Sequence, residues 1–522
     1  MATSDKYDRQ LRLWGADGQR RLGSTHILLI HASATGAETL KNLVLPGVKQ
    51  FTILDDHQVT QADTTNNFFV SSAALGKSRA VTVTELLLEM NSDVSGSYRH
   101  ANPQHVLENE PEYLDQFQLV IATQVEERVT KRLGELCASK KIPLILVNSY
   151  GLLGYFRLQV AQHTILDAKH DPPLHELRLS QPFPALQAYA AQFDLPTLET
   201  IDHAHVPFVV ILLKAVESWR ASHDGVLPKT FPEKNEFKQL IQSMAWGPTG
   251  HEVNFIEAVE NAYKAYSPPI VPGEVSEVLD AAKEIALTAE TPEFWFLARS
   301  LADFVAQNDG MLPITGVVPD MTASTETYVV LQQLYVTKAK EDAVGVRTIL
   351  QQHLASVGLA ADSISEEQVE AFCKNSYNLA MLDTRTITEE FKAADLDAID
   401  FEEENQQQSP LIWYFLLRAV SAFVPVFGRY PGSQEAKTGS DTEWLVARAK
   451  ILASGSPVAE WISHDHALEM VRSCEVELHN IAALMGGVAS QEAVKLITHQ
   501  FLPLNHTYIF NGISGLAATY NV

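Results

Sequence analysis

Short apolar runs alternate with helical stretches through the first third of the chain, and this alternation limits the folds that the chain can adopt. The first run, His26–Ile30, precedes a turn and a helical stretch over 36–45, and a second run, Phe51–Leu54, ends at Asp55. Further runs of strand type occupy residues 119–122, 143–147 and 154–160. Strands that alternate with helices are joined by right-handed crossovers, so we predict an α/β fold with a doubly wound, mostly parallel sheet.

The pattern changes after residue 165. Residues 166–176 are polar and rich in proline, which is typical of a linker. Helical periodicity then dominates until about residue 462, and the strand-like run Thr507–Phe510 returns to the α/β pattern after a helical stretch that begins near residue 479. We therefore predict a discontinuous α/β domain made of residues 1–165 and 479–522, interrupted by a large, mainly helical insertion at 166–478.

Charge and cysteine content exclude several classes of protein. The 39 basic and 64 acidic side chains give a net charge of -25, which disfavours nucleic acid and anionic membranes and suits a basic protein partner. Three scattered cysteines argue against a disulfide framework. The chain shows neither a signal peptide nor a run of about 18 apolar residues. We expect a soluble protein of the cytoplasm and nucleus.

The turn after the first strand is a degenerate nucleotide loop. Nucleotide-binding α/β proteins place glycines here so that backbone amides can approach phosphate at a helix N-terminus. In the segment His31–Gly36 only the last glycine remains, and His31 and Ser33 bring side chains instead. Asp55 occupies the usual position of a ribose-binding acid. We favour a role for Gly36 in helix packing and for Asp55 in ending a strand over ATP or NAD binding.

Two histidine-rich segments, Asp202–His205 and His464–His466, have the composition of metal sites. No cysteine or acidic set with suitable spacing accompanies them, so we interpret them as structural or surface histidines and predict no metal site in the chain.

Three segments stand out by their sequence: the opening YDRQLRLWG at 7–15, TLKNLVLPGV at 39–48 and NIAALMGGVASQEAVK at 480–495. Together and in this order they resemble ubiquitin-like-modifier-activating enzymes of the ThiF family. The resemblance implies a protein with two homologous adenylation halves, of which one binds and reacts ATP and the other is degenerate.

The chain departs from the active half wherever that half handles phosphate or metal. Asp55-Asp56-His57 stands in place of an Asp-x-Asp, residues 63–77 lack an expected arginine, and Thr123-Gln124-Val125 lacks a magnesium-placing acid. Stabilising charge on a transferring phosphate requires such groups. The chain is therefore interpreted as the inactive half, with no catalytic residue and no cofactor of its own; ATP and magnesium belong to the partner subunit.

The opening helix carries the one group that the resemblance assigns to ATP chemistry. Three of its side chains share a face suited to packing or to an interface: Tyr7, Leu11 and Trp14. Arg9 lies off this face, and the resemblance implies that it reaches the ATP phosphates of the partner in trans. The alternative is a surface arginine paired with Asp5 or Asp8. Helix geometry alone does not choose between Arg9 and Arg12.

Two further features concern the partner. Gly486 and Gly487 lie inside a helical pattern, where each glycine costs about 1 kcal/mol, and either packing inside the domain or a partner interface explains them. Cys137, Cys373 and Cys474 lie in no loop that resembles the family's cysteine motif, so the thioester cysteine is expected on the partner.

The long insertion selects one branch of the family. Segments similar to the regulatory subunits for the Nedd (Rub) modifier occupy residues 177–184, 203–210, 294–321 and 428–432. The resemblance implies an obligate heterodimer with a catalytic subunit that adenylates the modifier, forms a thioester and passes the modifier to a conjugating enzyme. An inert protein-binding adaptor, or a regulatory subunit for another ubiquitin-like modifier, remains the alternative.

Overall fold

The computed structural model describes residues 6–169, 176–246, 252–396, 399, 401, 406 and 408–522. It divides into two compact units, and the chain leaves the first at residue 163 and returns to it at residue 382. Unit 1 contains residues 1–163 and 382–522, and unit 2 contains 164–381. Most of the predicted linker at 166–176, and Asp5, lie outside the described residues.

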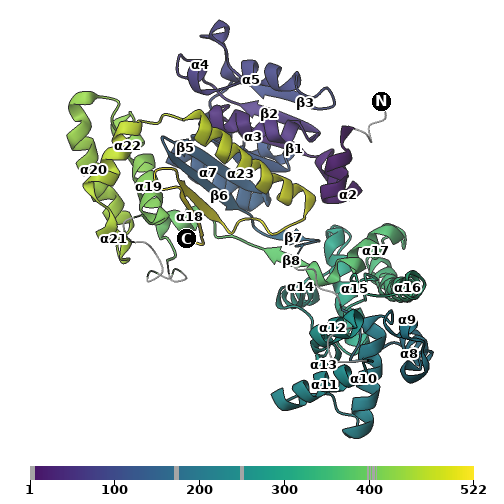
Figure 1. Cartoon of the computed structure of the whole chain (residues 1–522). Helices are drawn as coiled ribbons and strands as arrows, with labels where there is room; N and C mark the ends of the chain where they lie inside the picture. Colours follow the sequence, from purple (N-terminus) through teal and green to yellow (C-terminus); the bar gives the residue numbers. More distant parts are fainter. Residues whose placement is uncertain are drawn as a thin grey trace. The chain divides into compact units, whose positions relative to one another are not determined.

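Unit 1 is built on an eight-stranded sheet in the order β10-β9-β6-β5-β4-β1-β2-β3 (Figure 1). The parallel strands are β1 (His26–Ile30), β2 (Gln50–Leu54), β3 (Ser95–Arg99), β4 (Leu119–Ala122) and β5 (Leu144–Tyr150). Antiparallel strands extend the sheet beyond β5, namely β6 (Leu153–Gln159), β9 (Thr507–Asn511) and β10 (Leu516–Tyr520). The predicted mostly parallel, doubly wound sheet is confirmed.

Both faces of the parallel strands are buried. In β1, Ile27 and Leu29 belong to one hydrophobic core, and Leu28 and Ile30 belong to the other. Helices α3 (Ala34–Val44), α5 (Arg79–Leu88) and α23 (His479–Thr498) cover the first face, and α23 lies beside α3. The second face packs against α6 (Pro103–Asn109), α7 (Glu127–Lys140) and α19 (Pro410–Phe427). Burial on two faces explains why these strands read as continuous apolar runs.

The predicted insertion at 166–478 differs from the observed units, because its last part packs on the sheet. The elements concerned are α18 (Ile387–Lys392), α19, α20 (Thr438–Leu452), α21 (Val458–Trp461) and α22 (His464–Ser473). Leu411, Phe415 and Phe423 of α19 are buried in the same core as strands β4 and β5. These segments have the predicted helical character, but apolar faces alone do not reveal which core they join.

α19 also has the length and apolar composition of a helix that could cross a membrane, with 56% of that window buried inside the protein. α19 was not identified from the sequence as a long apolar run, because Arg418 and Ser421 interrupt its apolar residues. Burial against the sheet is the ordinary reason for such a composition in a core helix.

Unit 2 is helical and has two hydrophobic cores. One core contains α8 (Pro184–Ala191), α10 (Phe208–Ser222), α11 (Phe231–Ser243), α12 (Val253–Glu260) and α13 (Tyr263–Tyr266). The other contains α14 (Gly273–Glu284), α15 (Glu293–Gln307) and α17 (Glu366–Lys374). The 32-residue helix α16 (Thr325–Ser356) contributes its first half to one core and its second half to the other. The short strands β7 (His163–Ile165) and β8 (Ala380–Leu382) pair where the chain passes between the units.

Candidate functional site

The strand order of unit 1 reverses between β1 and β4, and open α/β sheets bind ligands at the carboxyl ends of strands at such a point. His31 directly follows β1, Asp55 follows β2, and Thr123 follows β4. The structure therefore brings the predicted nucleotide-loop residues together at the expected crevice. Gly36 faces the carbonyl oxygen of His31, which an added Cβ would meet at 2.7 Å. Close helix–strand packing requires this glycine.

The amino end of α3 is occupied by a carboxylate from the far end of the chain. Glu477 Oε2 accepts a hydrogen bond from the Ala34 amide at 3.0 Å, and Oε1 accepts from the Thr35 amide at 3.1 Å and the Thr35 hydroxyl at 2.6 Å. The hydroxyl groups of Ser33 and Ser149 donate to the same Oε1 at 3.1 and 3.3 Å. A helix amino end with free amides is an anion site, and here an internal carboxylate fills it.

The segment before α23 holds Glu477 in place. Gly151 donates its amide to the Val476 carbonyl at 2.7 Å, and the Asn66 side chain donates to the Glu477 carbonyl at 3.2 Å. Glu477 is only 8% exposed. The carboxylate is therefore enclosed by groups from three parts of the chain.

Asp55 is also fully engaged. Its carboxylate is buried and accepts hydrogen bonds from the Ala32 amide at 2.8 Å, the His57 amide at 2.9 Å and Arg79 Nε at 2.7 Å. Burial opposes its ionisation, but the hydrogen bond from His57 and the charge of Arg79 hold the pKa of Asp55 well below its ordinary value. Arg79 also contacts Asp63 at 3.2 Å. Asp55 therefore organises the loops around it, beyond the strand-ending role that we favoured.

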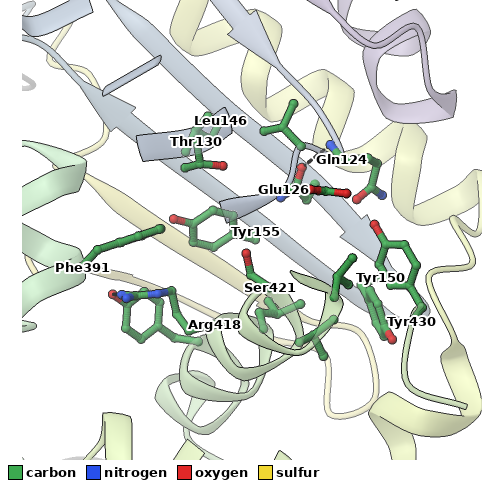
Figure 2. A pocket seen from close by; sticks show the side chains of 16 residues that line it. Gln124, Glu126, Thr130, Leu146, Tyr150, Tyr155, Phe391, Arg418, Ser421 and Tyr430 are labelled. Carbon is green, nitrogen blue, oxygen red and sulfur yellow. Dashed lines mark hydrogen bonds between the residues drawn. The ribbon is translucent and has the colours of Figure 1, made fainter. Parts of the chain in front are cut away.

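Gln124 takes the position that the resemblance assigns to a magnesium-placing acid. The backbone amide of Gln124 donates to Asn148 Oδ1 at 2.7 Å, and its side-chain Nε2 donates to the Ser149 carbonyl at 2.6 Å. Figure 2 shows Gln124 and Glu126 at one end of a cavity whose other end holds Phe391 and Arg418. The cavity measures about 80 Å³, whereas small-molecule pockets have roughly 300 Å³ or more. It does not replace the closed crevice as a nucleotide site.

The N-terminal helix α2 (Asp8–Leu22) is kinked at Gly15 and exposes Arg9. The Tyr7 hydroxyl lies 3.0 Å from Asp93 Oδ2, so this residue packs on its own unit. Arg12 pairs with Asp8 at 2.9 Å. Within the described part of the chain Arg9 forms no ion pair, so the pairing with Asp8 that we considered for it is taken by Arg12.

The two glycines of α23 have different surroundings. A Cβ on Gly486 would meet Glu38 Cβ at 2.7 Å and the Thr39 amide nitrogen at 2.9 Å, whereas a Cβ on Gly487 would meet nothing within 4 Å. Gly487 lines a surface groove of about 830 Å³ together with Trp14. Leu11 is half-buried on the same helix as Trp14. Packing thus explains Gly486, and Gly487 remains available to a partner.

The other sequence candidates have structural surroundings. His203 is buried, lies 2.8 Å from Glu252 and stacks on Trp246. His466 takes part in the amino-terminal cap of α22 with Ser463. Among the described residues, neither histidine-rich segment belongs to a group of three or more potential metal ligands.

Sequence reasoning missed Glu477, Arg79 and the contact between His31 and His57. Glu477 follows a long insertion, and its local sequence carries no signal of an anion mimic. Arg79 lies just beyond the 63–77 segment that was compared with the active half. The imidazoles of His31 and His57 come from two strand ends and meet edge-on, with ring centroids 4.8 Å apart.

Sequence comparisons with known proteins cover nearly the whole chain. The ThiF family model matches residues 7–519. The NEDD8-activating enzyme E1 regulatory subunit of Danio rerio is 38% identical over 99% of this chain and 98% of its own length. The regulatory subunit AXL of Arabidopsis thaliana is 38% identical over 97% of both chains, and the Drosophila melanogaster regulatory subunit is 36% identical over 99% and 97%. Among solved structures, E. coli MccB with AMPCPP matches with a TM-score of 0.27 and 17% identity over 30% of this chain and 49% of that chain.

Proposed function

The chain belongs to the ThiF family, among the NEDD8-activating enzyme E1 regulatory subunits, and from this premise we propose that it leaves ATP chemistry to a catalytic partner. The observation that carries the proposal is the carboxylate of Glu477 at the amino end of α3. A phosphate at this position would compete with the Glu477 carboxylate for the same backbone amides, and the two anions would repel each other. The chain then binds no nucleotide of its own, and the heterodimer holds one.

The thiols of this chain support the assignment of thioester chemistry to the partner. Burial raises the pKa values of Cys137 and Cys373 to about 12, and burial also raises the pKa of Cys474. A thiol that stays protonated at neutral pH is a poor nucleophile. The proposed heterodimer therefore adenylates a NEDD8-type modifier with ATP and magnesium on the catalytic subunit, transfers it to that subunit's cysteine, and passes it to a conjugating enzyme.

Arg9 is the side chain of this chain that we propose to act in the partner's ATP site. It is exposed, it stands on a helix held to unit 1 through Tyr7 and Trp14, and its neighbour Arg12 is already paired. A guanidinium supplied in trans can stabilise charge on a transferring phosphate. The groove beside Gly487 is the proposed contact surface for the catalytic subunit, because it is open and lies next to the same helix.

Nucleotide stoichiometry tests the closed site. We expect equilibrium binding of a non-hydrolysable ATP analogue to the co-expressed heterodimer to saturate at one nucleotide per pair. Saturation at two nucleotides, with one lost when the catalytic subunit's site is disabled, would show that the crevice of this chain opens and would overturn the proposal.

Co-purification tests the contact surface. Gly487→Arg places a long side chain in the groove, and we expect it to reduce recovery of the catalytic subunit with the tagged chain. Gly439→Arg is the matched control, since Gly439 also lies in a helix with nothing within 4 Å of an added Cβ. Equal recovery with both variants would place the interface elsewhere.

A further inference from the structure

Four side chains that can bind metal meet at the carboxyl ends of β1 and β2. They are His31, Asp55, Asp56 and His57, and one ligand atom from each lies within 4.8 Å of the others. The parallel pairing of Ile30 with Leu54 ends the two strands side by side, so the residues that follow them must converge. Neither the closed anion site nor the proposed partner contacts use His57 or Asp56.

Asp55 turns Oδ1 toward this cluster, where it also accepts the His57 amide at 2.9 Å, and its other oxygen is anchored from outside. Its Oδ2 accepts hydrogen bonds from the Ala32 amide at 2.8 Å and from Arg79 at 2.7 Å. Its Oδ1 lies 2.9 Å from His57 Nδ1. A carboxylate held through one oxygen, with the second oriented inward, is the arrangement that supports metal ligands in proteins.

Asp56 repeats this arrangement. Its Oδ2 accepts a hydrogen bond from the Asn102 side chain at 2.8 Å, and its Oδ1 lies 3.3 Å from His57 Nδ1. The inner oxygens of two anchored carboxylates therefore converge on one imidazole nitrogen.

His31 is oriented by the backbone. Its Nδ1 lies 3.3 Å from the Gln124 carbonyl oxygen, which can only accept, so Nδ1 carries the hydrogen and Nε2 keeps its lone pair. A hydrogen bond from the ring nitrogen that does not bind the metal fixes the tautomer of a metal-binding histidine. The residue sits in the left-handed region, at φ 63°, and is half-buried, so its ring has little freedom to turn away.

In place of the sequence-based prediction of no metal site, we propose that His31, Asp55, Asp56 and His57 bind one divalent cation of the zinc class. Two imidazoles and two carboxylates suit zinc, cobalt or nickel, whereas magnesium and calcium prefer oxygen ligands alone. Ligand atoms around tetrahedral zinc lie about 3.4 Å apart, so the widest separations, up to 4.8 Å, close by about an ångström on binding, and the 2.9 Å contact between Asp55 Oδ1 and His57 Nδ1 widens. The His57 side chain is 53% exposed and can make this movement.

The local charge favours a divalent cation. Asp55 and Asp63 pair with Arg79, and Asp56 lies beside His57, so three carboxylates against one guanidinium leave two negative charges for the cation to balance. The bound ion would tie together the loops after β1 and β2 and stabilise the folded chain, because the unfolded chain lacks the assembled site.

Cobalt and zinc titrations test the site on the full chain, freed of affinity-tag histidines and treated with chelator. We expect one equivalent of Co²⁺ to produce the intense visible bands of tetrahedral cobalt and Zn²⁺ to displace it. His57→Ala and Asp56→Asn should each lower the affinity by at least about tenfold. His105→Ala removes an exposed histidine outside the cluster and should leave the affinity unchanged.

Two further measurements keep the test decisive. His31→Asn retains a residue that tolerates the left-handed conformation, so it removes a ligand while preserving the loop. Zinc should raise the thermal unfolding midpoint of the wild-type chain and not that of His57→Ala. Absence of stoichiometric binding, or binding that His57→Ala and His31→Asn leave unchanged, would overturn the proposal.

Discussion

The Glu477 carboxylate accepts hydrogen bonds from both the amide and the hydroxyl of Thr35, at 3.1 and 2.6 Å. These two residues are separated by nearly the whole chain, yet their contact closes the first turn of α3 where a nucleotide-binding relative of this fold would expose its amides. The fold thus keeps the amino-terminal anion site of the helix and fills it internally. Closure of the site and stability of the fold therefore depend on the same carboxylate.

Glu477→Gln should destabilise the chain by about 2 kcal/mol, because it removes a charge that faces the helix amides and places an NH₂ donor among other donors. Denaturant unfolding measures the loss. Glu475→Gln is the matched control, since Glu475 lies two residues earlier and is exposed, and it should change stability by less than about 0.5 kcal/mol. Equal effects of the two substitutions would contradict the role of Glu477.

The two adjacent glycines of α23 should respond oppositely to alanine. Gly486→Ala forces a Cβ into Glu38 and the Thr39 backbone and should cost about 1–3 kcal/mol. Gly487→Ala meets open space and should be neutral or stabilise the helix by up to about 1 kcal/mol. Thermal unfolding of the two variants compares them directly. A stable Gly486→Ala variant would show that α23 does not need this close approach to α3.

A buried ion pair between Arg157 and Glu390 should be costly to break. Both side chains are fully buried, with Nε and Oε2 2.5 Å apart. Arg157→Met leaves the carboxylate with the Tyr414 hydroxyl, at 2.8 Å, and should cost about 3–5 kcal/mol. Adding Glu390→Gln should recover part of this loss in denaturant unfolding, and a double variant as unstable as the sum of the single variants would contradict the pairing.

His163 should make stability fall in acid. Burial lowers the pKa of His163 from its ordinary value of 6.5 to about 3. Between these two pH values the unfolded chain binds a proton at His163 and the folded chain does not. The sign follows: stability is unaffected above about pH 6.5 and decreases as the pH falls toward 3, by about 2 kcal/mol at pH 5. His163→Phe keeps a ring against His499 and should reduce the drop in unfolding midpoint between pH 7.5 and 5. An identical drop in wild type and variant would refute this assignment.

Central strands were predictable and edge strands were not. β1 and β4 match the predicted runs residue for residue, because burial on both faces selects uninterrupted apolar sequence. β3, with the polar sequence SGSYR, and β10 are the two edge strands of the sheet in the described part of the chain, so neither needs an apolar run. β6 was predicted as two pieces, and in the structure it is one strand in which Arg157 interrupts the apolar pattern.

The candidate site was predictable only where it is local in sequence. His31, Ser33, Gly36 and Asp55 follow strands, so their convergence at one edge of the sheet follows from topology. Glu477 was not predictable, because a side chain that enters from a distant segment leaves no periodic or spacing signal.

ATP–pyrophosphate exchange by the co-expressed heterodimer tests most directly whether this chain acts in trans while its own site stays closed. Arg9→Ala should reduce exchange by about a hundredfold or more, as expected for removal of a group that stabilises transition-state charge. Arg12→Ala, which removes only an exposed partner of Asp8, should retain the wild-type rate. Exchange that is unchanged by Arg9→Ala would contradict the account and favour a subunit that acts as a scaffold alone.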